Sequence, residues 1–502
     1  MKIAFINDPH ERFGIEHVSA LLKANGHQTR LFIDPKLFDD GEFSVRWLAR
    51  VFDHRQRLIA ELKAYQPDLV GFSVDTYSYQ WALGMARDIK KEMPVPIILG
   101  GIHPTSVPER VIDNESVDMV CVGEGEYAML ELVNSMAKGR VDHAIRNIWF
   151  KKDGRVIRNE VRPLIEDLDA LPMPDKELYY SVSPHSSEIY FIMTGRGCAN
   201  SCSYCCHSYL KGIYKNKGKY LRQRSIDNII EELVHARDKY RIKMVRFWDD
   251  DFMVGRNAGW FREFSRRYKE KVGLPFICYL YPRDVPEEVI RDLKEAGCCE
   301  VNIGVQSWDD HVRREVLSRD TPNAEIDALL DVLKRNRINV TADFICGLPL
   351  QSDDDAVNFI RSCGRGKVGD INFFGIKYFP GSSMTQRMKA NGTFSDLQYE
   401  EILEGKKPAL IHMGGDLAFK AIIKFKVAAW FFKVFPQRVA EYCVEKKFYR
   451  VLGEVVPPWL LELIYNYSMT GHERKYLTRL HRRHYMHFIV KMIRSSFGGT
   501  AL

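Results

Sequence analysis

The sequence predicts an α/β protein in which two strand–helix units are followed by a C-terminal α-helical region. Apolar strand patterns alternate with helical patterns over residues 1–140, and the same alternation returns over residues 186–390. Residues 391–502 instead have helical periodicity, interleaved aromatic side chains and an excess of positive charge. A chain of 502 residues is long enough for two or three domains, since a single core rarely grows beyond about 250–300 residues.

The first unit, residues 1–140, is predicted to be a doubly wound parallel sheet. The predicted strands are 2–6, 68–74, 97–101 and 117–123, and the predicted helices are 14–25 and 81–91. Ligands bind such sheets beyond the carboxyl ends of the strands. Small and polar residues follow each predicted strand, at 8–14, 73–76, 100–103 and 123–126. The sequence therefore predicts a ligand site along this edge of the sheet.

A connector, residues 141–185, is predicted between the two units. Residues 147–157 have the pattern of a small hairpin. Prolines in Leu171–Asp175 hold that stretch as an extended linker. The linker is too short for the two units to tumble independently.

The second unit, residues 186–390, begins with the stretch around which the chain is organised. An apolar run predicts a buried strand, and the glycine-bounded loop after it has three cysteines at CxxxCxxC spacing. These cysteines are Cys198, Cys202 and Cys205. Such a loop can wrap three thiolates around one inorganic centre, and three protein ligands leave one position open for chemistry. The other predicted strands are 243–248, 276–281, 300–305, 339–346 and 371–379, and the predicted helices are 226–241, 287–296 and 323–335.

Zinc is the alternative interpretation of the cysteine loop, because Cys206 and His207 follow at once and could supply a fourth ligand. However, adjacent residues rarely point to one tetrahedral centre, and no second CxxC pair completes a zinc ribbon. Most of the other cysteines are scattered singly, which is typical of a reducing compartment and disfavours a disulfide. Cys298, Cys299 and Cys346, like Cys206, are interpreted as small buried side chains.

The loop Thr194–Cys205 resembles that of the radical S-adenosylmethionine (SAM) superfamily, whose CxxxCxxC cysteines hold a four-iron four-sulfur cluster. The resemblance implies that Cys198, Cys202 and Cys205 are metal ligands and catalytic residues, and that SAM chelates the remaining iron. An electron from the reduced cluster would then cleave SAM to a 5′-deoxyadenosyl radical. The resemblance also implies a partial (β/α)6 TIM barrel over residues 186–390, with functional residues at the carboxyl ends of its strands.

Six further contacts with SAM are implied by the same resemblance. They are Tyr204 near the adenine, Asp249 and Asp250 facing the methionine amino group, and Arg283, Gln306 and Ser307 toward the carboxylate or ribose. Carboxylates suit a cationic amine and ribose hydroxyls. Each of the six could instead cap a helix or form a salt bridge at the end of the barrel.

The first unit resembles the cobalamin-binding, Rossmann-like domain that precedes the cluster loop in many radical SAM enzymes. The residues that the resemblance assigns to cobalamin are Gly14, Ser73, Gly100, Gly101, His103, Gly123 and Glu124. Glycines suit a surface that a large flat corrin approaches closely. A flavodoxin-like module that has lost its cofactor is the alternative.

One departure from this family concerns the lower ligand of cobalt. Proteins that place a histidine below the metal use DxHxxG, whereas Asp8 and His10 are followed here by Gly14, one residue too late. His10 is therefore expected to be a loop residue. The resemblance then implies a cobalt that is five-coordinate or bound to water.

The C-terminal region, residues 391–502, carries the excess positive charge of the chain. Between Lys420 and Arg494 there are 15 Lys and Arg residues against 5 Asp and Glu residues, whereas the whole chain has a net charge of +7. We interpret this region as a helical cap with a solvated basic face. An anionic membrane surface or an anionic substrate are the alternatives. Nucleic acid is not expected, because no recognised binding module is present.

The sequence favours a soluble, cytoplasmic protein. The apolar run at the N-terminus is too short for a signal peptide, and no stretch approaches the apolar length of a membrane span. Contact of the basic C-terminal helices with the inner face of a membrane is compatible with this location.

Taken together, the resemblances imply a cobalamin-dependent radical SAM enzyme with a [4Fe-4S] cluster, SAM and cobalamin as cofactors. The expected reaction is methylation of an unactivated carbon in a small-molecule or lipid-like substrate, with a flavodoxin or ferredoxin as electron donor. A radical SAM cyclase or rearrangement enzyme without methyl transfer is the first alternative. A corrinoid- or metal-binding regulator without turnover is the second.

Overall fold

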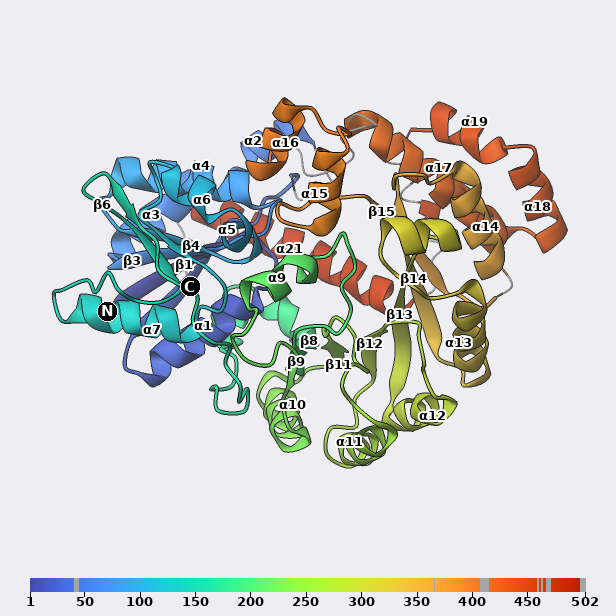
Figure 1. Cartoon of the computed structure of the whole chain (residues 1–502), viewed down its shortest axis with the longest axis horizontal. Helices are drawn as coiled ribbons and strands as arrows, with labels where there is room; N and C mark the ends of the chain where they lie inside the picture. The colour runs from blue at the N-terminus through green and yellow to red at the C-terminus, as the bar shows by residue number, and fades with distance from the viewer. Residues whose placement is uncertain are drawn as a thin grey trace.

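The computed structural model describes residues 1–39, 45–364, 366–406, 415–457, 460–461, 464–465 and 471–496. Its strands form two large sheets covered by helices, and a third, two-stranded sheet lies between them (Figure 1). In Figure 1 the N-terminal sheet lies on the left, and the sheet that carries the cysteine loop lies right of centre. The predicted α/β class with a helical C-terminal region is confirmed.

The first sheet has seven strands in the order β2-β1-β3-β4-β5-β6-β7. The strands are β1 (Lys2–Asn7), β2 (Gln28–Ile33), β3 (Leu69–Ser73), β4 (Ile97–Gly100), β5 (Met119–Cys121), β6 (Ile148–Lys152) and β7 (Arg155–Ile157). Strands β1 to β5 are parallel, and β6 and β7 are antiparallel additions.

Helices cover both faces of this sheet, which confirms the doubly wound, Rossmann-like fold. One face packs on α1 (Phe13–Ala24) and α7 (Glu126–Ala137), and the other on α3 (Arg55–Tyr65) and α4 (Tyr79–Glu92). The shorter helices of the unit and the connector are α2 (Arg46–Val51), α5 (Ile102–Ser106), α6 (Pro108–Asp113) and α8 (Glu177–Tyr180).

Six elements of the first unit are absent from the prediction: strand β2 and the helices α2, α3, α5, α6 and α7. Strand β2 lies at the edge of the sheet, and its first three residues are polar and at least partly exposed, so the sequence lacks a continuous apolar run there. Helix α3 has only three buried apolar side chains among many charged ones. The predicted hairpin of the connector forms β6 and β7 and pairs with β5, so the sheet continues beyond residue 140.

The second sheet has six parallel strands in the order β15-β14-β13-β12-β11-β8. The strands are β8 (Ile189–Ile192), β11 (Met244–Phe247), β12 (Phe276–Leu280), β13 (Cys298–Gln306), β14 (Asn339–Cys346) and β15 (Asp370–Gly375). Each strand neighbours the next one in the sequence, as in a barrel that is not closed. This order confirms the predicted partial (β/α)6 barrel.

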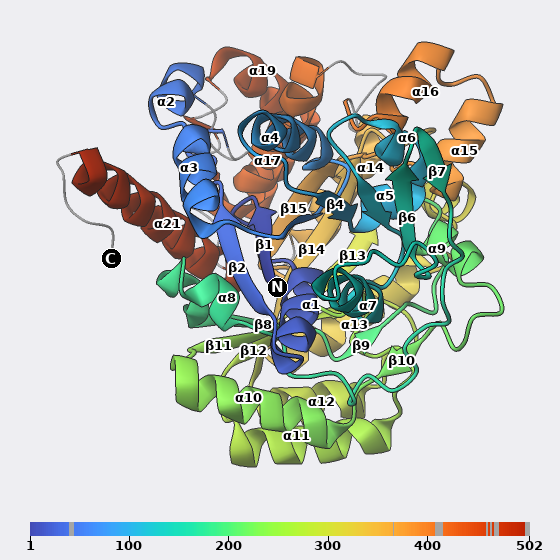
Figure 2. The same cartoon turned by 90° about the vertical axis from the view of Figure 1, so that its left-hand side faces the viewer.

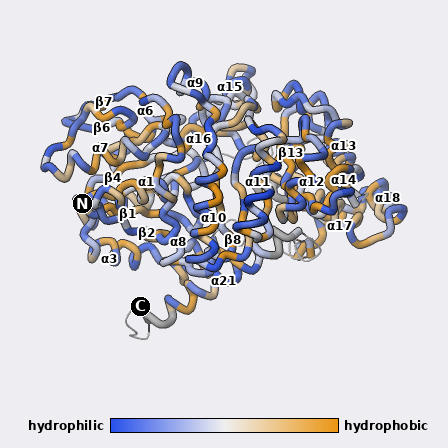
Figure 3. The backbone as a smooth tube through the Cα atoms, turned by 90° about the horizontal axis from the view of Figure 1, so that it is seen from below, coloured by the Kyte–Doolittle hydropathy of each residue, from blue (hydrophilic) through white to orange (hydrophobic). Residues whose placement is uncertain are grey.

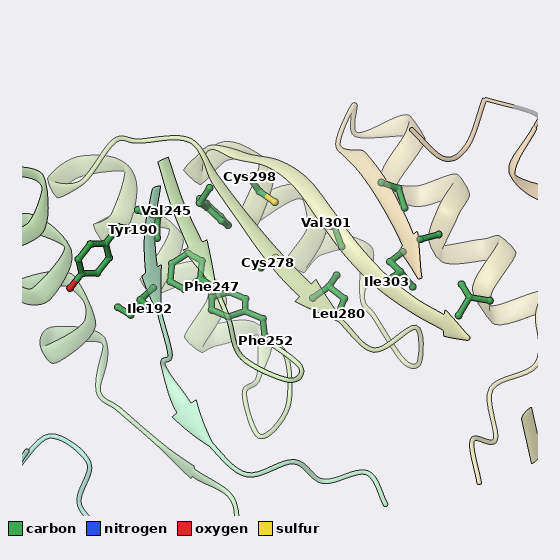
Figure 4. Packing of buried hydrophobic residues seen from close by; sticks show 14 of the residues in the cluster. Tyr190, Ile192, Val245, Phe247, Phe252, Cys278, Leu280, Cys298, Val301 and Ile303 are labelled. Atoms are coloured by element: carbon green, nitrogen blue, oxygen red, sulfur yellow. The ribbon is translucent and has the colours of Figure 1, made fainter. Parts of the chain in front are cut away.

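Helices line the outer side of the barrel sheet (Figure 2). They are α10 (Ile226–Tyr240), α11 (Ala258–Lys271), α12 (Glu287–Ala296), α13 (Asn323–Arg335) and α14 (Asp353–Cys363). Alternate strand residues face these helices, and Figure 4 shows Val245 and Phe247 of β11 among them. The ring of Phe247 lies 5.3 Å from that of Phe276 and 4.6 Å from that of Phe252. Burial of such rings stabilises the barrel wall.

The C-terminal region is helical, as predicted. Its helices are α15 (Ser383–Ala390), α16 (Asp396–Leu403), α17 (Gly415–Val434), α18 (Gln437–Glu445), α19 (Phe448–Val455) and α21 (His472–Ser496). Helix α17 packs on β15 and α14. Among the described residues, none of the helices combines the length and the apolar character that crossing a membrane requires.

Helix α21 contacts both units, and its C-terminal part projects beyond them (Figure 2). Arg483 forms an ion pair with Glu188 of η1 (Pro184–Glu188), the turn that leads into β8. The hydroxyl of Tyr485 accepts a hydrogen bond from the backbone N–H of Phe38, 3.0 Å away in the first unit. The most basic helix of the chain is therefore a bridge between the two units.

Candidate active site at the junction of the two sheets

The cysteine loop follows β8 and is anchored by a short antiparallel pair, β9 (Gly195–Arg196) with β10 (Arg222–Gln223). Gly197 has a φ of +90°, and a Cβ atom there would lie 2.2 Å from the carbonyl oxygen of Tyr220. Only glycine fits this approach. Gly197 therefore fixes the turn between β9 and Cys198, the first cysteine of the loop.

The three cysteines of the motif are free thiols. Cys198 and Cys202 are buried and Cys205 is half-buried. Burial raises the pKa of Cys198 to about 11, so this thiol stays protonated at neutral pH unless a metal supplies positive charge. Three free thiols in one sheltered loop fit a cluster that is bound through its iron atoms.

Arg319 contacts this loop, although the sequence does not predict it as a site residue. Its Nη1 donates to Cys202 Sγ at 3.5 Å and lies 3.4 Å from the Tyr204 hydroxyl. Its Nη2 donates to the carbonyl oxygen of Gly304 at 2.6 Å. The guanidinium is buried and lowers the pKa of Cys202 against the larger, opposing effect of burial. Arg319 lies 117 residues after Cys202 and belongs to no short motif, so only the fold brings the two together.

The substitution Arg319→Met is expected to lower the reduction potential of a cluster bound by the loop. A charged hydrogen bond to sulfur is worth about 1.5–3 kcal/mol, which for one electron corresponds to a shift on the order of 100 mV. A redox titration of the anaerobically reconstituted protein, followed by electron paramagnetic resonance, measures this shift. Arg314→Met is the control, because that side chain is 59% exposed. An unchanged potential in the Arg319 variant would contradict a role for this charge.

The structure brings Cys205, Cys206 and His207 together, with ligand atoms within 4.8 Å of one another. His207 is already held at both ring nitrogens, by Asp250 at 2.8 Å and by the Tyr220 hydroxyl at 2.6 Å. Zinc binding through His207 would break one of these hydrogen bonds. The arrangement therefore favours the three-cysteine centre over the zinc alternative.

Four residues predicted to contact SAM lie close to the cysteine loop. Tyr204 touches Arg319, and Asp250 touches His207. Gln306 ends β13 with a φ of +69°, beside Gly304. Asp249 is buried and accepts hydrogen bonds from the backbone and hydroxyl of Thr194 at 3.1 and 2.8 Å. Burial raises the pKa of Asp249, although Arg256 and Thr194 oppose that effect.

The other two predicted contacts point elsewhere in this structure. Ser307 is fully buried and donates to Asp355 Oδ2 at 2.6 Å, which ties the end of β13 to α14. Arg283 is 48% exposed and lies 3.6 Å from Asp284. Both residues remain predictions as SAM contacts, and their observed partners are those of a structural residue and a surface ion pair.

The predicted corrin edge of the first sheet is partly filled by the chain itself. Gly101 has a φ of +100°, and a Cβ there would lie 2.5 Å from the carbonyl oxygen of Val74. At Gly123, with a φ of +83°, a Cβ would lie 2.0 Å from the Tyr214 hydroxyl. Glu124 accepts from Arg222 at 2.9 Å and thereby ties the edge to β10. Gly101 packs within the first unit, whereas Gly123 and Glu124 join the first unit to the second.

An open part of the same edge lies at the ends of β1 and β3. Gly14 is exposed. A Cβ atom added there would lie 4.0 Å from the Ser73 hydroxyl oxygen and would have no closer neighbour. Gly100, at the end of β4, lies beside Cys121. His10 is 68% exposed and lies 3.3 Å from Asp8, in agreement with its expected place in a loop. The small residues at β1 and β3 fit the approach of a large flat ligand.

His103 lies inside the domain rather than on this surface. Its Nδ1 is 3.2 Å from the Thr76 hydroxyl, and its ring centroid lies 4.1 Å from that of Tyr79. Burial lowers the pKa of His103 to about 4, so the ring is neutral in the folded protein at neutral pH.

Acidification is expected to destabilise the first unit through His103. The unfolded chain binds a proton at His103 near the ordinary pKa of about 6.5, whereas the folded chain binds it only near 4. The contribution of the neutral ring to the free energy of unfolding is therefore complete above pH 6.5 and is lost as the pH falls toward 4. Between about pH 7 and pH 5 the loss amounts to about 2 kcal/mol. Urea unfolding at both pH values measures it. His103→Gln should make the loss between the two pH values smaller by about 2 kcal/mol, whereas the exposed control His311→Gln should leave it unchanged; burial also lowers the pKa values of His17 and His185, so part of the loss persists in both variants.

Helix α9 (His207–Ile213), which begins two residues after Cys205, is seated on the edge of the first sheet. The Tyr209 hydroxyl donates to the carbonyl oxygen of Ile102 at 3.1 Å, just beyond β4. The Tyr214 hydroxyl accepts from the backbone N–H of Glu124 at 2.7 Å, just beyond β5. The cysteine loop and the carboxyl ends of the first sheet therefore meet at one junction.

Comparison with known proteins agrees with this geometry. A family model described as "B12 binding domain" matches residues 3–133, and one described as "Radical SAM superfamily" matches residues 192–363. A radical SAM domain and a B12-binding domain are both present in this chain. The predicted cofactors, a [4Fe-4S] cluster, SAM and cobalamin, are consistent with these two domains.

Relatives of this radical SAM enzyme include methyltransferases and cyclases. An uncharacterized methyltransferase of Pyrococcus horikoshii is 27% identical over 345 residues, which cover 68% of this chain and 73% of that protein. An anaerobic magnesium-protoporphyrin IX monomethyl ester cyclase of Rubrivivax gelatinosus is 24% identical over 375 residues, 69% of this chain and 63% of that protein. The fold is similar to that of the cobalamin-dependent S-adenosylmethionine radical enzyme OxsB, whose structure was solved with aqua-cobalamin and SAM bound. The TM-score is 0.65 and the sequence identity is 15%, and the match covers 97% of this chain and 75% of that one.

Proposed function

We propose that this enzyme transfers a methyl group to an unactivated carbon of a small-molecule or lipid-like substrate. The observation that carries the proposal is the junction at which α9 seats the cysteine loop on the carboxyl ends of β4 and β5. When bound, the cluster with SAM supplies hydrogen abstraction, and cobalamin supplies the methyl group. In this proposal the cluster and the corrin bind on either side of this junction, because transfer between two reacting groups requires proximity.

The residues at the junction have separate tasks in this proposal. Cys198, Cys202 and Cys205 hold the cluster, and Arg319 offsets thiolate charge at Cys202. Tyr204, beside Arg319, positions SAM. Glycines and small side chains at the ends of β1 and β3 bind the corrin, where the surface is open.

Two candidate functions with different products compete with methyl transfer. A cyclase or rearrangement enzyme has the same cofactors, and the cyclase of Rubrivivax gelatinosus among the relatives supports this second candidate. A regulator that binds corrinoid or metal without turnover is the third.

Anaerobic incubation with dithionite, SAM whose methyl group is deuterated, and a small-molecule extract tests all three. Methyl transfer predicts 5′-deoxyadenosine together with an extract component that gains the labelled methyl group in mass spectrometry. A cyclase predicts 5′-deoxyadenosine and a product without the label. A regulator predicts neither, and that result would contradict the proposal.

The proposal also includes two partners. Reduction of the cluster requires an electron donor, for which a flavodoxin or ferredoxin has suitable chemistry. The C-terminal region is proposed to contact an anionic membrane peripherally, because its charge and its exposed aromatic side chains match such a surface.

A further inference from the structure

The strands of the barrel sheet turn alternate side chains inward, away from the covering helices. Val245 and Phe247 of β11 pack toward the helices in Figure 4, so Arg246 and Trp248 face inward. By the same alternation, the inward side chains of the neighbouring strands include Tyr279, Asn302, Asp343, Asn372 and Phe374. The inner face of the barrel therefore combines aromatic rings with polar groups.

This inner face is closed at the amino ends of the strands and open at their carboxyl ends. At the closed end, the buried Asp370 accepts a hydrogen bond from the backbone N–H of Gly471 at 2.9 Å. Gly471 directly precedes α21, which lies on the opposite side of the molecule from α9 (Figure 3). At the open end, Trp248 is 41% exposed and Phe374 is 45% exposed. The inner face therefore opens toward the cysteine loop and α9.

The indole ring of Trp248 is held in place by three neighbours. The guanidinium of Arg246 lies 4.2 Å from the centre of the ring and also donates to the Tyr279 hydroxyl. The rings of Phe191 and Tyr279 lie 5.3 and 5.7 Å from the indole, at interplanar angles of 71° and 70°. Because the guanidinium stacks on one face of an indole that is still largely exposed, the opposite face is a fixed platform for a flat ligand.

Asp343 supplies a hydrogen-bond acceptor on the same inner face. Its Oδ1 accepts from the amide of Asn372 at 2.9 Å, and its Oδ2 accepts from none of the residues that the structure describes. Burial raises the pKa of Asp343 to about 6, although Asn372 and Arg246 oppose that effect. The carboxylate is therefore the main form at neutral pH, and Oδ2 can accept a hydrogen bond from a ligand.

Charge on the inner face does not favour an anionic ligand. The six strands contain four charged residues, which are Arg246, Glu300, Asp343 and Asp370. At the closed end, Glu300 accepts from the Thr341 hydroxyl at 2.6 Å, and Asp370 lies 3.8 Å from Lys433 Nζ. One cation thus accompanies three carboxylates. A ligand that donates a hydrogen bond suits this face better than a carboxylate or a phosphate.

We infer that the inner face binds the substrate through a flat, uncharged heteroaromatic ring that carries an N–H group. The ring stacks on the open face of Trp248, and its N–H donates to Asp343 Oδ2. Aromatic walls with a few placed polar groups are typical of small-molecule sites. The inference rests on the proposed function, because it narrows the substrate of that reaction from a small-molecule or lipid-like compound to a flat nitrogen heterocycle.

The adenine of SAM and a saturated lipid chain are two other occupants of this face. Tyr204, which is proposed to position SAM, contacts Arg319, and Arg319 donates to the carbonyl oxygen of Gly304 in β13. Trp248 lies instead between rings of β8 and β12. A lipid chain would leave the acceptor of Asp343 without a donor. Both occupants agree less well with the structure, and both are included in the measurement.

Ligand-observed NMR on the anaerobically reconstituted chain with hydroxocobalamin, in the presence and absence of SAM and without a reductant, tests the inference. The probes are carbostyril, a flat uncharged lactam, its N-methyl derivative, which lacks the N–H, decanol as a lipid-like chain, and naphthoate as a flat anion. We expect carbostyril to bind most tightly and not to be displaced by SAM. N-methylcarbostyril should bind about tenfold more weakly, because a hydrogen bond to a carboxylate is lost.

Two variants locate the ring on the inner face. Trp248→Leu is expected to weaken the binding of carbostyril and of N-methylcarbostyril alike, by about three- to tenfold, because a stacking surface is lost. Asp343→Asn should weaken carbostyril alone, since Asn372 still donates to the remaining carbonyl oxygen and an NH2 group replaces the acceptor. The matched controls are Trp47→Leu in α2 and Asp238→Asn in α10, both at exposed positions.

The outcomes separate the inference from its competitors and from the proposed reaction. Undetectable binding of carbostyril, equal binding of its N-methyl derivative, or displacement of carbostyril by SAM would overturn it. Tighter binding of decanol or naphthoate would do the same, as would Trp248 and Asp343 variants that bind like the unmodified chain. None of these results depends on turnover. Absence of both 5′-deoxyadenosine and a labelled product counts against the proposed function instead.

Discussion

Alanine at Cys198, Cys202 or Cys205 is expected to reduce 5′-deoxyadenosine formation to background, and alanine at Cys206 is expected to leave it nearly unchanged. Each of the three lies in the loop that leaves β9, and two of them are buried at the end of the barrel. With one thiolate removed, a three-ligand centre loses a bond that no neighbouring side chain replaces in the same geometry. Iron and sulfide content after anaerobic reconstitution, together with the visible absorbance of the cluster, are measured beside turnover.

Cys206 is the informative control for these variants, because it is adjacent to Cys205 and its sulfur lies within 4.8 Å of the Cys205 ligand atom. If Cys206→Ala loses metal as fully as Cys205→Ala does, the centre uses a different ligand set. Retention of zinc with no iron in the unmodified chain would point to the same conclusion. Either result would contradict the three-cysteine cluster.

The substitution Lys176→Met is expected to lower the free energy of unfolding by about 3–5 kcal/mol, the typical consequence of removing one partner of a buried ion pair. Lys176 is 1% exposed and its Nζ lies 2.9 Å from Oε2 of Glu16, a side chain with no exposed surface. Glu11 pairs with the same ammonium. Burial raises the pKa of Glu16, and the charge of Lys176 opposes that effect, so the carboxylate depends on this partner.

Urea unfolding measures this effect, with Lys239→Met as the matched control. Lys239 is 47% exposed and pairs with Glu177 at 3.3 Å, so its removal should change the free energy of unfolding by less than about 1 kcal/mol. Adding Glu16→Gln to the Lys176 variant should restore part of the loss, because the unpaired buried charge is then gone. Equal effects of the Lys176 and Lys239 substitutions would show that the buried triad contributes little.

The lysine also explains how the connector joins the two sheets. Lys176 belongs to the connector, Glu16 to α1, and the ammonium lies 5.0 Å from the centre of the Tyr190 ring in β8. One charge therefore holds a helix of the first unit against a strand of the second. The sequence predicts the linker beside Lys176 from its prolines, but it does not show that this particular lysine is buried.

The sequence predicts most of the strands, the helices α1, α4, α10, α12 and α13, and the cysteine loop, because each depends on local periodicity or on one short spacing. Residues 323–335 and 339–346, for example, form helix and strand over the predicted bounds. Strand β2 escapes prediction because an edge strand with polar, exposed residues lacks the apolar run of a central one.

Side-chain partners across the fold are harder to predict than elements. Glu124 lies in the predicted glycine-rich turn, yet its carboxylate pairs with Arg222 and Arg196 from the barrel unit. Ser307 follows its strand as expected, but its hydroxyl points to Asp355. Arg319 reaches Cys202 only through tertiary contact. A family resemblance assigns roles to positions in the chain, whereas these partners depend on how the two units dock.

The bridge made by α21 has a consequence for biosynthesis. Tyr485 and Phe38 are 447 positions apart, so their contact forms only after nearly all of the described chain has left the ribosome. Until then the edge strand β2, which lines a cavity of about 360 Å³ together with Phe488 and Lys491, lacks its cover. Uncovered edge strands recruit other chains. A nascent chain stalled before α21 should therefore depend on chaperones and aggregate when released without them.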